Sequence, residues 1–245
     1  MIIILTLSPS LLYSKQLFST PIHSIARKYS GIIIGATGAT GAQLLIELLR
    51  SEKWGKILTL TRRDYEIPTS SGINEKQEVE NGRLEKRVID FEKVEQEVGS
   101  LQGYDYMFSC FGTTRANAGS AAAFMHIDHD YNVNAAKGAK EAGIQHYGLM
   151  SAYNANPKSW FTYMKCKGQI EEDLKALDFT SLSIFKPGLL NRGSMYRLNE
   201  RVFSWFSYAI PVEAVARTMR IAAEKELEST ETNPHWKEYY NKDMK

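Results

Sequence analysis

The sequence of 245 residues is poor in cysteine, with only Cys110 and Cys166. Two thiols cannot form the disulfide framework of a small secreted domain, and they are compatible with a reducing compartment. They are also too few for a cysteine-based metal cluster, and the histidines His126 and His129 lack ligand spacing relative to the acids around them. We therefore expect no metal site.

Long apolar runs are missing as well. No stretch reaches the ~18 apolar residues that a membrane-spanning helix requires, so we expect no membrane span, while peripheral membrane association stays open. The formal net charge of +2 is too small to indicate a nucleic-acid partner. With 43% apolar and 24% charged residues, the composition is that of a globular protein, and the length fits one domain with a large core.

Acidic residues are absent from the N-terminal part of the chain, where the first is Glu47. Lys15, Arg27 and Lys28 are interleaved there with serine and aliphatic residues, which is the composition of a mitochondrial presequence, and Arg27 fits a matrix-protease pattern. We therefore predict that residues 1–29 form a targeting segment or an N-terminal arm. The predicted location is mitochondrial, with the cytoplasm as the alternative, and the folded domain is expected to cover residues 30–245.

The most informative stretch is the sequence GIIIGATGATG at residues 31–41. β-Branched residues typical of a buried strand lead into three glycines, and a leucine-rich helical pattern follows up to Arg50. At such a junction glycines permit a tight turn, close approach of a pyrophosphate and close helix packing, while the first helical N–H groups bind the phosphates. The predicted phosphate-binding residues are Gly35, Thr37, Gly38, Ala39, Thr40 and Gly41.

A second strand is predicted at residues 56–61 and ends in Arg62 and Arg63. In a dinucleotide-binding fold the residue after this strand faces the adenosine ribose. An acid there would accept hydrogen bonds from the 2′-hydroxyl of NAD, whereas a guanidinium pairs with the 2′-phosphate of NADP. Because no acid lies between the end of this strand and Asp64, the two arginines predict NADP(H) as the cofactor.

The rest of the chain alternates between strand and helix patterns. Further strands are predicted at 85–91, 105–111, 146–151 and 181–185, and helices at 92–98, 128–141, about 159–177 and 213–226. The irregular stretch 192–206 is expected to form a small cap over a substrate, and residues 236–241 a short tail helix. Together these elements predict an α/β fold: a doubly wound (Rossmann) parallel sheet of six strands, with helices on both faces and a small C-terminal substrate portion.

Polar residues follow several predicted strands, at the edge of the sheet where such folds bind ligands. Asp90 lies near the end of the third strand and is placed to contact the adenine. Gly112, Thr113 and Thr114 follow the fourth strand and suit the phosphates and ribose of a dinucleotide.

Candidate catalytic residues come after the fifth strand. Ser151 ends that strand, and Tyr163 and Lys167 follow at an i, i+4 spacing, which places both on one helix face. A free phenol has a pKa of about 10 and is a poor acid–base group at neutral pH, but a neighbouring ammonium stabilises its phenolate form. Tyr163 is then a proton donor to a carbonyl oxygen, Ser151 binds that oxygen, and Lys167 also holds the nicotinamide ribose.

These motifs together resemble the short-chain dehydrogenase/reductase family. The segments that carry the resemblance are GATGATG, TRR, DF, CFGTTR, YMKCK and FKPG. More narrowly, CFGTTRANAGSAAAFMHIDHDY and FKPGLL look like its atypical branch, which contains the Tat-interacting oxidoreductase and fungal mitochondrial relatives. The resemblance covers about residues 30–225. It implies that Asp90 and Phe91 contact the adenine, that Tyr163 and Lys167 also contact the cofactor, and that Pro187 borders the nicotinamide.

The resemblance leaves several functions open. The first is an NADPH-dependent reductase of a small carbonyl compound. The alternative is an NADPH-binding regulatory protein whose occupancy controls a protein partner, because the family includes regulators. An epimerase-like enzyme is a weaker reading, since the stretch after Gly188 leaves little room for a sugar-nucleotide domain. One departure from the family pattern is Asp128, which stands where many relatives carry an asparagine. The substrate and the oligomeric state do not follow from the sequence.

Overall fold

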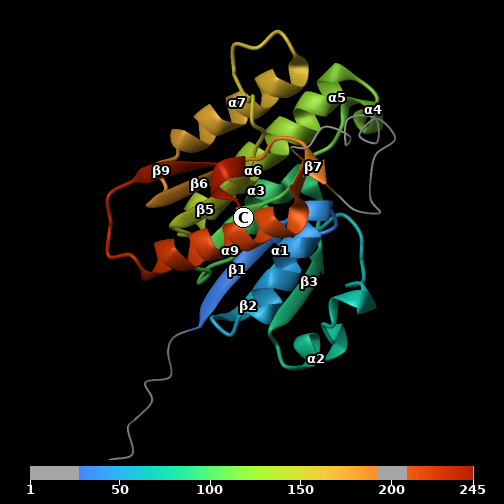
Figure 1. The fold of residues 1–245 in the computed structure, drawn as a ribbon, viewed down its shortest axis with the longest axis vertical. Helices are drawn as coiled ribbons and strands as arrows, with labels where there is room; N and C mark the ends of the chain where they lie inside the picture. Colours follow the sequence, from blue (N-terminus) through green and yellow to red (C-terminus); the bar gives the residue numbers. More distant parts are fainter. Residues whose placement is uncertain (1–27, 192–208, 245) are drawn as a thin grey trace, which may run out of the picture.

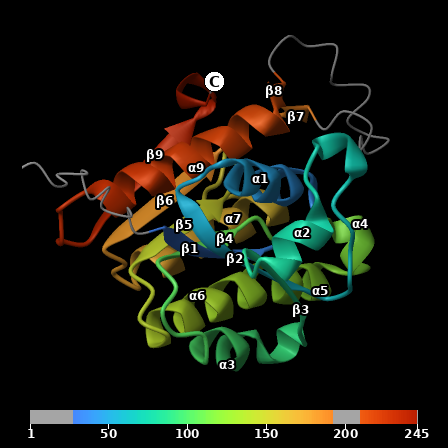
Figure 2. The ribbon, with the colours of Figure 1, turned by 90° about the horizontal axis from the view of Figure 1, so that it is seen from below.

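A computed structural model describes residues 28–191 and 209–244 of the chain. Its centre is a seven-stranded sheet in the order β3-β2-β1-β4-β5-β6-β9, in which all neighbouring strands run parallel. Helices cover both faces of this sheet, which Figure 1 shows face-on and Figure 2 from the edge. The predicted doubly wound α/β fold is therefore confirmed.

The strands and main helices have the following bounds. The sheet consists of β1 (Tyr29–Ile34), β2 (Trp54–Thr61), β3 (Leu84–Val88), β4 (Tyr106–Ser109), β5 (His146–Met150), β6 (Ser181–Lys186) and β9 (His235–Tyr240). One face carries α1 (Ala39–Arg50) and α9 (Val212–Glu228), and the other carries α3 (Val94–Gly99), α6 (Tyr131–Glu141) and α7 (Thr162–Lys175). Two short strands, β7 (Leu190–Asn191) and β8 (Ile210–Pro211), pair with each other outside the sheet.

Strand β1 shows how the apolar sequence builds two cores. Ile32, Ile33 and Ile34 have no exposed surface. Ile32 and Ile34 pack in the core under α3, α6 and α7, whereas Ile33 packs in the core under α1 and α9. Successive side chains of a strand point to opposite faces, so a continuous apolar run is what a parallel sheet covered on both sides requires.

The C-terminal segment corrects one prediction, because residues 236–241 do not form a helix. Residues 236–240 belong to β9, which pairs with β6 in parallel register from Ser181↔His235 to Lys186↔Tyr240, and Asn241 begins a 3₁₀ turn. The aromatic residues that we assigned to a helix suit a strand, and Tyr239 stacks on Phe185 of β6 with ring centroids 4.9 Å apart. The sheet therefore has one strand more than predicted. The predicted cap at 192–206 lies outside the described residues.

Shorter elements occupy the connections. They are α2 (Glu75–Glu80), α4 (Arg115–Ala118), α5 (Ala121–Met125) and a π-helical turn (His126–Asp130) that leads into α6. The third strand ends at Val88, three residues earlier than predicted, because Phe91–Lys93 form a 3₁₀ turn. No helix within the described ranges has both the length and the apolar character needed to cross a membrane.

The contact between α3 and α6 depends on Gly138. A Cβ atom at this residue would lie 2.4 Å from the carbonyl oxygen of Glu95, so Gly138→Ala forces the two helices apart. The gain in helix propensity, about 1 kcal/mol, opposes this strain but does not cancel it. We expect a net loss of about 1–2 kcal/mol in the free energy of unfolding, measured by urea denaturation. The exposed neighbour Lys137→Ala is the control, and equal stability of both variants would contradict the close packing.

Candidate functional site

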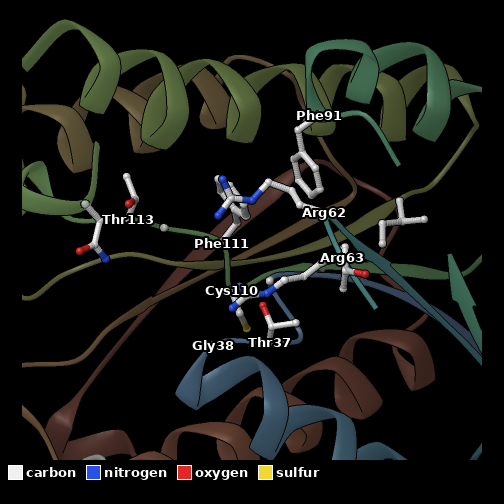
Figure 3. Close-up of a pocket in the computed structure, with 13 residues that line it drawn as sticks. Thr37, Gly38, Arg62, Arg63, Phe91, Cys110, Phe111 and Thr113 are labelled. Carbon is white, nitrogen blue, oxygen red and sulfur yellow. The ribbon is translucent and has the colours of Figure 1, made fainter. Parts of the chain in front are cut away.

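A cavity of about 550 Å³ opens at the carboxyl ends of β1, β2 and β4 (Figure 3). The strand order reverses between β1 and β4, which is where open α/β sheets bind ligands. The residues that line this cavity are Gly35, Thr37, Gly38, Leu60, Thr61, Arg62, Arg63, Phe91, Cys110, Phe111, Gly112, Thr113 and Asn117. The cavity thus brings together the glycine turn, the two arginines and the residues after β4.

The glycine turn is built by close backbone packing. Gly35 has a φ of +84°, and a Cβ atom there would lie 2.6 Å from the carbonyl oxygen of Cys110. A Cβ atom on Gly41 would lie 2.1 Å from the carbonyl oxygen of Gly35. Neither residue leaves room for a side chain, so both hold α1 close to the ends of β1 and β4.

The N-terminus of α1 is open toward this cavity. Gly38 is its N-cap residue and provides no side-chain acceptor, and the first turn contains no acid. The N–H groups that begin a helix have no intrahelical partner, and the helix dipole gives them partial positive charge. Thr37 and Gly38 line the cavity, so this end of α1 fits a pyrophosphate.

Arg62 and Arg63 bring positive charge to the same cavity. Figure 3 shows Arg62 over the ring of Phe111, at 6.0 Å from its centroid, and Arg63 extending toward Thr37. Neither guanidinium forms an ion pair with a carboxylate within residues 28–191 and 209–244. The nearest acid in the sequence, Asp64, instead binds Lys86 at 2.9 Å, and the hydrogen bond from Lys86 lowers the pKa of its carboxyl group. The arginines are therefore available to a phosphate.

Two phenylalanines form the wall beside the arginines. Phe91 and Phe111 stack with ring centroids 5.0 Å apart, and both line the cavity. Phe111 was missed as a site residue by the sequence reasoning, although it is the last residue of the predicted fourth strand. Asp90 does not line the cavity, because it is exposed and its side chain accepts a hydrogen bond from the N–H of Glu92 at 3.0 Å. Its contact with an adenine stays a prediction.

A smaller cavity of about 130 Å³ adjoins the first one. It is lined by Gly38, Ala39, Thr40, Cys110, Phe111, Gly112, Thr113, Met150, Ser151, Tyr163, Lys167 and Leu190, five of which also line the larger cavity. The three candidate catalytic residues therefore share one cavity next to the glycine turn. Thr114 and Pro187 line neither: Thr114 Oγ1 accepts from the N–H of Asn117 at 3.2 Å, and the carbonyl of Pro187 accepts from the N–H of Tyr153 at 2.9 Å.

Lys167 is held by a carboxylate that lies 39 residues earlier in the chain. Its Nζ is 2.8 Å from Oδ2 of Asp128, and both side chains are buried. The other oxygen of Asp128 accepts a hydrogen bond from the N–H of Thr113 at 2.6 Å. Burial favours the neutral amine, but the Asp128 carboxylate outweighs it and raises the pKa of Lys167 above its ordinary value. Lys167 is thus an ammonium ion at neutral pH, next to a Tyr163 that is 43% exposed.

Ser151 is bound to a second buried ion pair. Its Oγ donates a hydrogen bond to Oε1 of Glu171, and Oε2 of Glu171 lies 2.8 Å from Nζ of Lys186. All three side chains are buried. A hydroxyl has one proton, and here it goes to the carboxylate, so Ser151 presents only oxygen lone pairs to the cavity. Sequence reasoning missed this pair, although Glu171 follows Lys167 by four residues on the same helix.

Comparison with known proteins first defines the class. A sequence model of the NAD(P)H-binding family matches residues 35–226, and the chain belongs to this family. Among solved structures, the Citrobacter sp. triphenylmethane reductase complexed with NADP(H) has the same fold, with a TM-score of 0.59 and 15% identity over 86% of this chain and 69% of the reductase. MoeE5 in complex with UDP-glucose and NAD gives a TM-score of 0.64 at 14% identity, covering 86% of this chain and 75% of MoeE5.

Within the class, the chain is similar to two kinds of curated protein. It is 36% identical to protein HTATIP2 of Rattus norvegicus over 202 residues, covering 78% of this chain and 79% of the rat protein. It is 41% identical to the mitochondrial protein FMP52-1 of Scheffersomyces stipitis over 161 residues, covering 66% and 67%. These similarities confirm the family resemblance that the motifs predicted.

Removal of the Asp128 charge tests the buried pair. Asp128→Asn leaves the ammonium of Lys167 buried without a counter-charge, and we expect a loss of about 3 kcal/mol in the free energy of unfolding. The double variant Asp128→Asn with Lys167→Met removes both charges and is expected to recover part of this loss. Lys76→Gln, which breaks an exposed pair with Glu80 at 3.8 Å, is the control and should change stability by less than about 0.5 kcal/mol. A double variant that is less stable than Asp128→Asn would contradict the interpretation that Asp128 and Lys167 form a buried ion pair.

Proposed function

We propose that this protein is an NADPH-dependent oxidoreductase of the short-chain dehydrogenase type that acts on a small carbonyl or alcohol substrate. The observation that carries the proposal is the adjacency of two sites. A glycine turn lies beside Arg62 and Arg63, which form no ion pair with a carboxylate of the described residues, and it adjoins a cavity that contains Ser151, Tyr163 and Lys167. A protein that only binds a nucleotide has no need for Ser151, Tyr163 and Lys167 in one cavity.

The residues present fit NADP(H). The N-terminus of α1 would hold the pyrophosphate, and Arg62 and Arg63 would pair with the 2′-phosphate. Phe91 and Phe111 offer apolar surface to the adenine. When bound, the cofactor supplies or accepts a hydride.

The remaining chemistry belongs to the side chains of the smaller cavity. Tyr163 is the acid that donates a proton to the carbonyl oxygen of the substrate. The Lys167 ammonium, which Asp128 holds in place, stabilises the phenolate left behind. Because the proton of Ser151 goes to Glu171, Ser151 acts as an acceptor for the hydroxyl group of the alcohol form.

The proposed role of the two arginines predicts different binding affinities for NADPH and NADH. We expect wild-type protein to bind NADPH more tightly than NADH, measured by titration with nicotinamide fluorescence. Arg62→Ser with Arg63→Ser removes the partners of the 2′-phosphate and is expected to weaken NADPH binding about 100-fold while NADH binding stays nearly constant. The control is Arg87→Ser on β3, which is paired with Glu85 at 2.6 Å outside the cavity. Tighter binding of NADH by the wild type would refute NADP specificity, and binding of neither would refute the cofactor proposal.

The role of Tyr163 is tested by removing one oxygen atom. We expect Tyr163→Phe to lower turnover about 10³-fold, since general acid catalysis contributes on that order, while NADPH affinity is kept. Turnover is followed as NADPH consumption in a screen of aldehydes, ketones and quinones. Tyr153→Phe is the matched control, because Tyr153 is more exposed and lines neither cavity. Full activity of the Tyr163 variant would show that another group is the acid.

We also propose that the protein is located in mitochondria. The fungal relatives are named mitochondrial proteins, and residues 1–29 have the composition of a presequence. Cell fractionation followed by N-terminal sequencing tests this. Recovery in the mitochondrial fraction is expected, and recovery only in the cytosol would contradict it.

A further inference from the structure

Two neighbouring aromatic side chains on the loop that joins β5 to α7 are exposed to solvent. Trp160 is 101% exposed and Phe161 is 76% exposed. In Figure 1 this loop, coloured gold, projects beyond the N-terminal end of α7 at the top of the molecule. Large aromatic side chains usually bury most of their surface, so this exposure indicates a surface that binds something.

Backbone hydrogen bonds attach this loop to neighbouring segments of the chain. The N–H of Tyr153 donates to the carbonyl of Pro187 at 2.9 Å, and the N–H of Asn156 donates to the carbonyl of Met164 at 3.0 Å. The loop also packs tightly on α7, where a Cβ atom on Gly168 would lie 2.2 Å from the nitrogen of Pro157. The two aromatic residues are therefore held outward by a fixed backbone.

The two stretches of chain that carry and adjoin these aromatic residues contain basic but no acidic side chains. The sequence contains no Asp or Glu between residues 142 and 170, nor between 112 and 127. These two stretches meet where the ring of Phe124 in α5 contacts that of Tyr163 in α7, with centroids 6.3 Å apart. Lys158 and Lys165 are exposed on this surface. The two stretches therefore carry basic side chains and no carboxylate, a distribution that attracts anions.

We propose that Lys158, Trp160, Phe161 and Lys165 form a docking surface for an anionic membrane. Trp and Phe rings insert at the level of the lipid headgroups, and lysines pair with anionic headgroups beside them. A stable protein interface requires about 800 Å² of complementary surface on each partner, whereas this feature is the projecting end of one loop. Docking places the entrance to the Tyr163 cavity next to the bilayer. The inference goes beyond the proposed oxidoreductase activity and does not depend on it.

The test is cosedimentation of the full-length protein with vesicles. One set contains phosphatidylcholine alone, and the other contains phosphatidylcholine mixed with the anionic phosphatidylglycerol. We expect binding to the anionic vesicles that weakens as salt is added. Trp160→Ser with Phe161→Ser is expected to lower the vesicle partition coefficient about tenfold, and Lys158→Gln with Lys165→Gln is expected to lower it to the level seen with phosphatidylcholine alone. Trp236→Ser is the matched control, because Trp236 is an exposed tryptophan on the edge strand β9.

Three outcomes would overturn the proposal. The first is that wild-type protein binds neither kind of vesicle. The second is that the aromatic double variant binds anionic vesicles as tightly as wild type, which would assign the binding to another part of the chain such as the N-terminal segment. The third is that this variant changes the oligomeric state, measured by analytical ultracentrifugation, without changing vesicle binding. Unchanged NADPH affinity of the variants serves as the check that they fold.

Discussion

The site depends on the packing of three backbone segments around Gly35. The end of β1, the first turn of α1 and the residue after β4 approach so closely that a Cβ atom on Gly35 or Gly41 would overlap backbone atoms. This packing aims the N-terminus of α1 at the larger cavity, which Arg62 and Arg63 also line. Because main-chain atoms make this packing, the surface that we propose for phosphate binding is preformed, and a preformed surface lowers the entropy that binding costs.

The smaller cavity depends on two buried ion pairs. Asp128–Lys167 connects the π-helical turn to α7, and Glu171–Lys186 connects α7 to β6. Buried charges are costly to desolvate, so such pairs are weak evidence for stability. Their effect here is on position, since α7 carries Tyr163 and both pairs fix that helix relative to the ends of the strands. π-Helical turns recur at functional sites, and this one supplies the carboxylate that holds Lys167.

The described residues around the two cavities include two separate groups of basic side chains. The arginines beside the glycine turn face a cavity suited to a dinucleotide phosphate, and the lysines near Trp160 flank an apolar projection at the start of α7. One positive region therefore lines a cavity inside the protein, and the other faces outward. The net charge of +2 for the whole chain does not reveal these two basic regions, because acidic residues elsewhere in the chain offset their charge.

Features whose signals are local could be predicted from the amino-acid sequence. The glycine spacing, the basic end of β2 and the pair Tyr163–Lys167 each lie within a few residues, where strand and helix periodicity govern which side chains share a face. That residues 235–240 form a strand could not be predicted in this way, because an aromatic hexapeptide becomes a strand when a neighbouring strand such as β6 offers hydrogen bonds. The partners of the candidate catalytic residues likewise follow from the tertiary structure. Asp128 and Lys167 lie 39 residues apart, and Ser151 and Glu171 lie 20 apart, so their contact arises when α7 docks on the sheet and leaves no periodic trace in the chain.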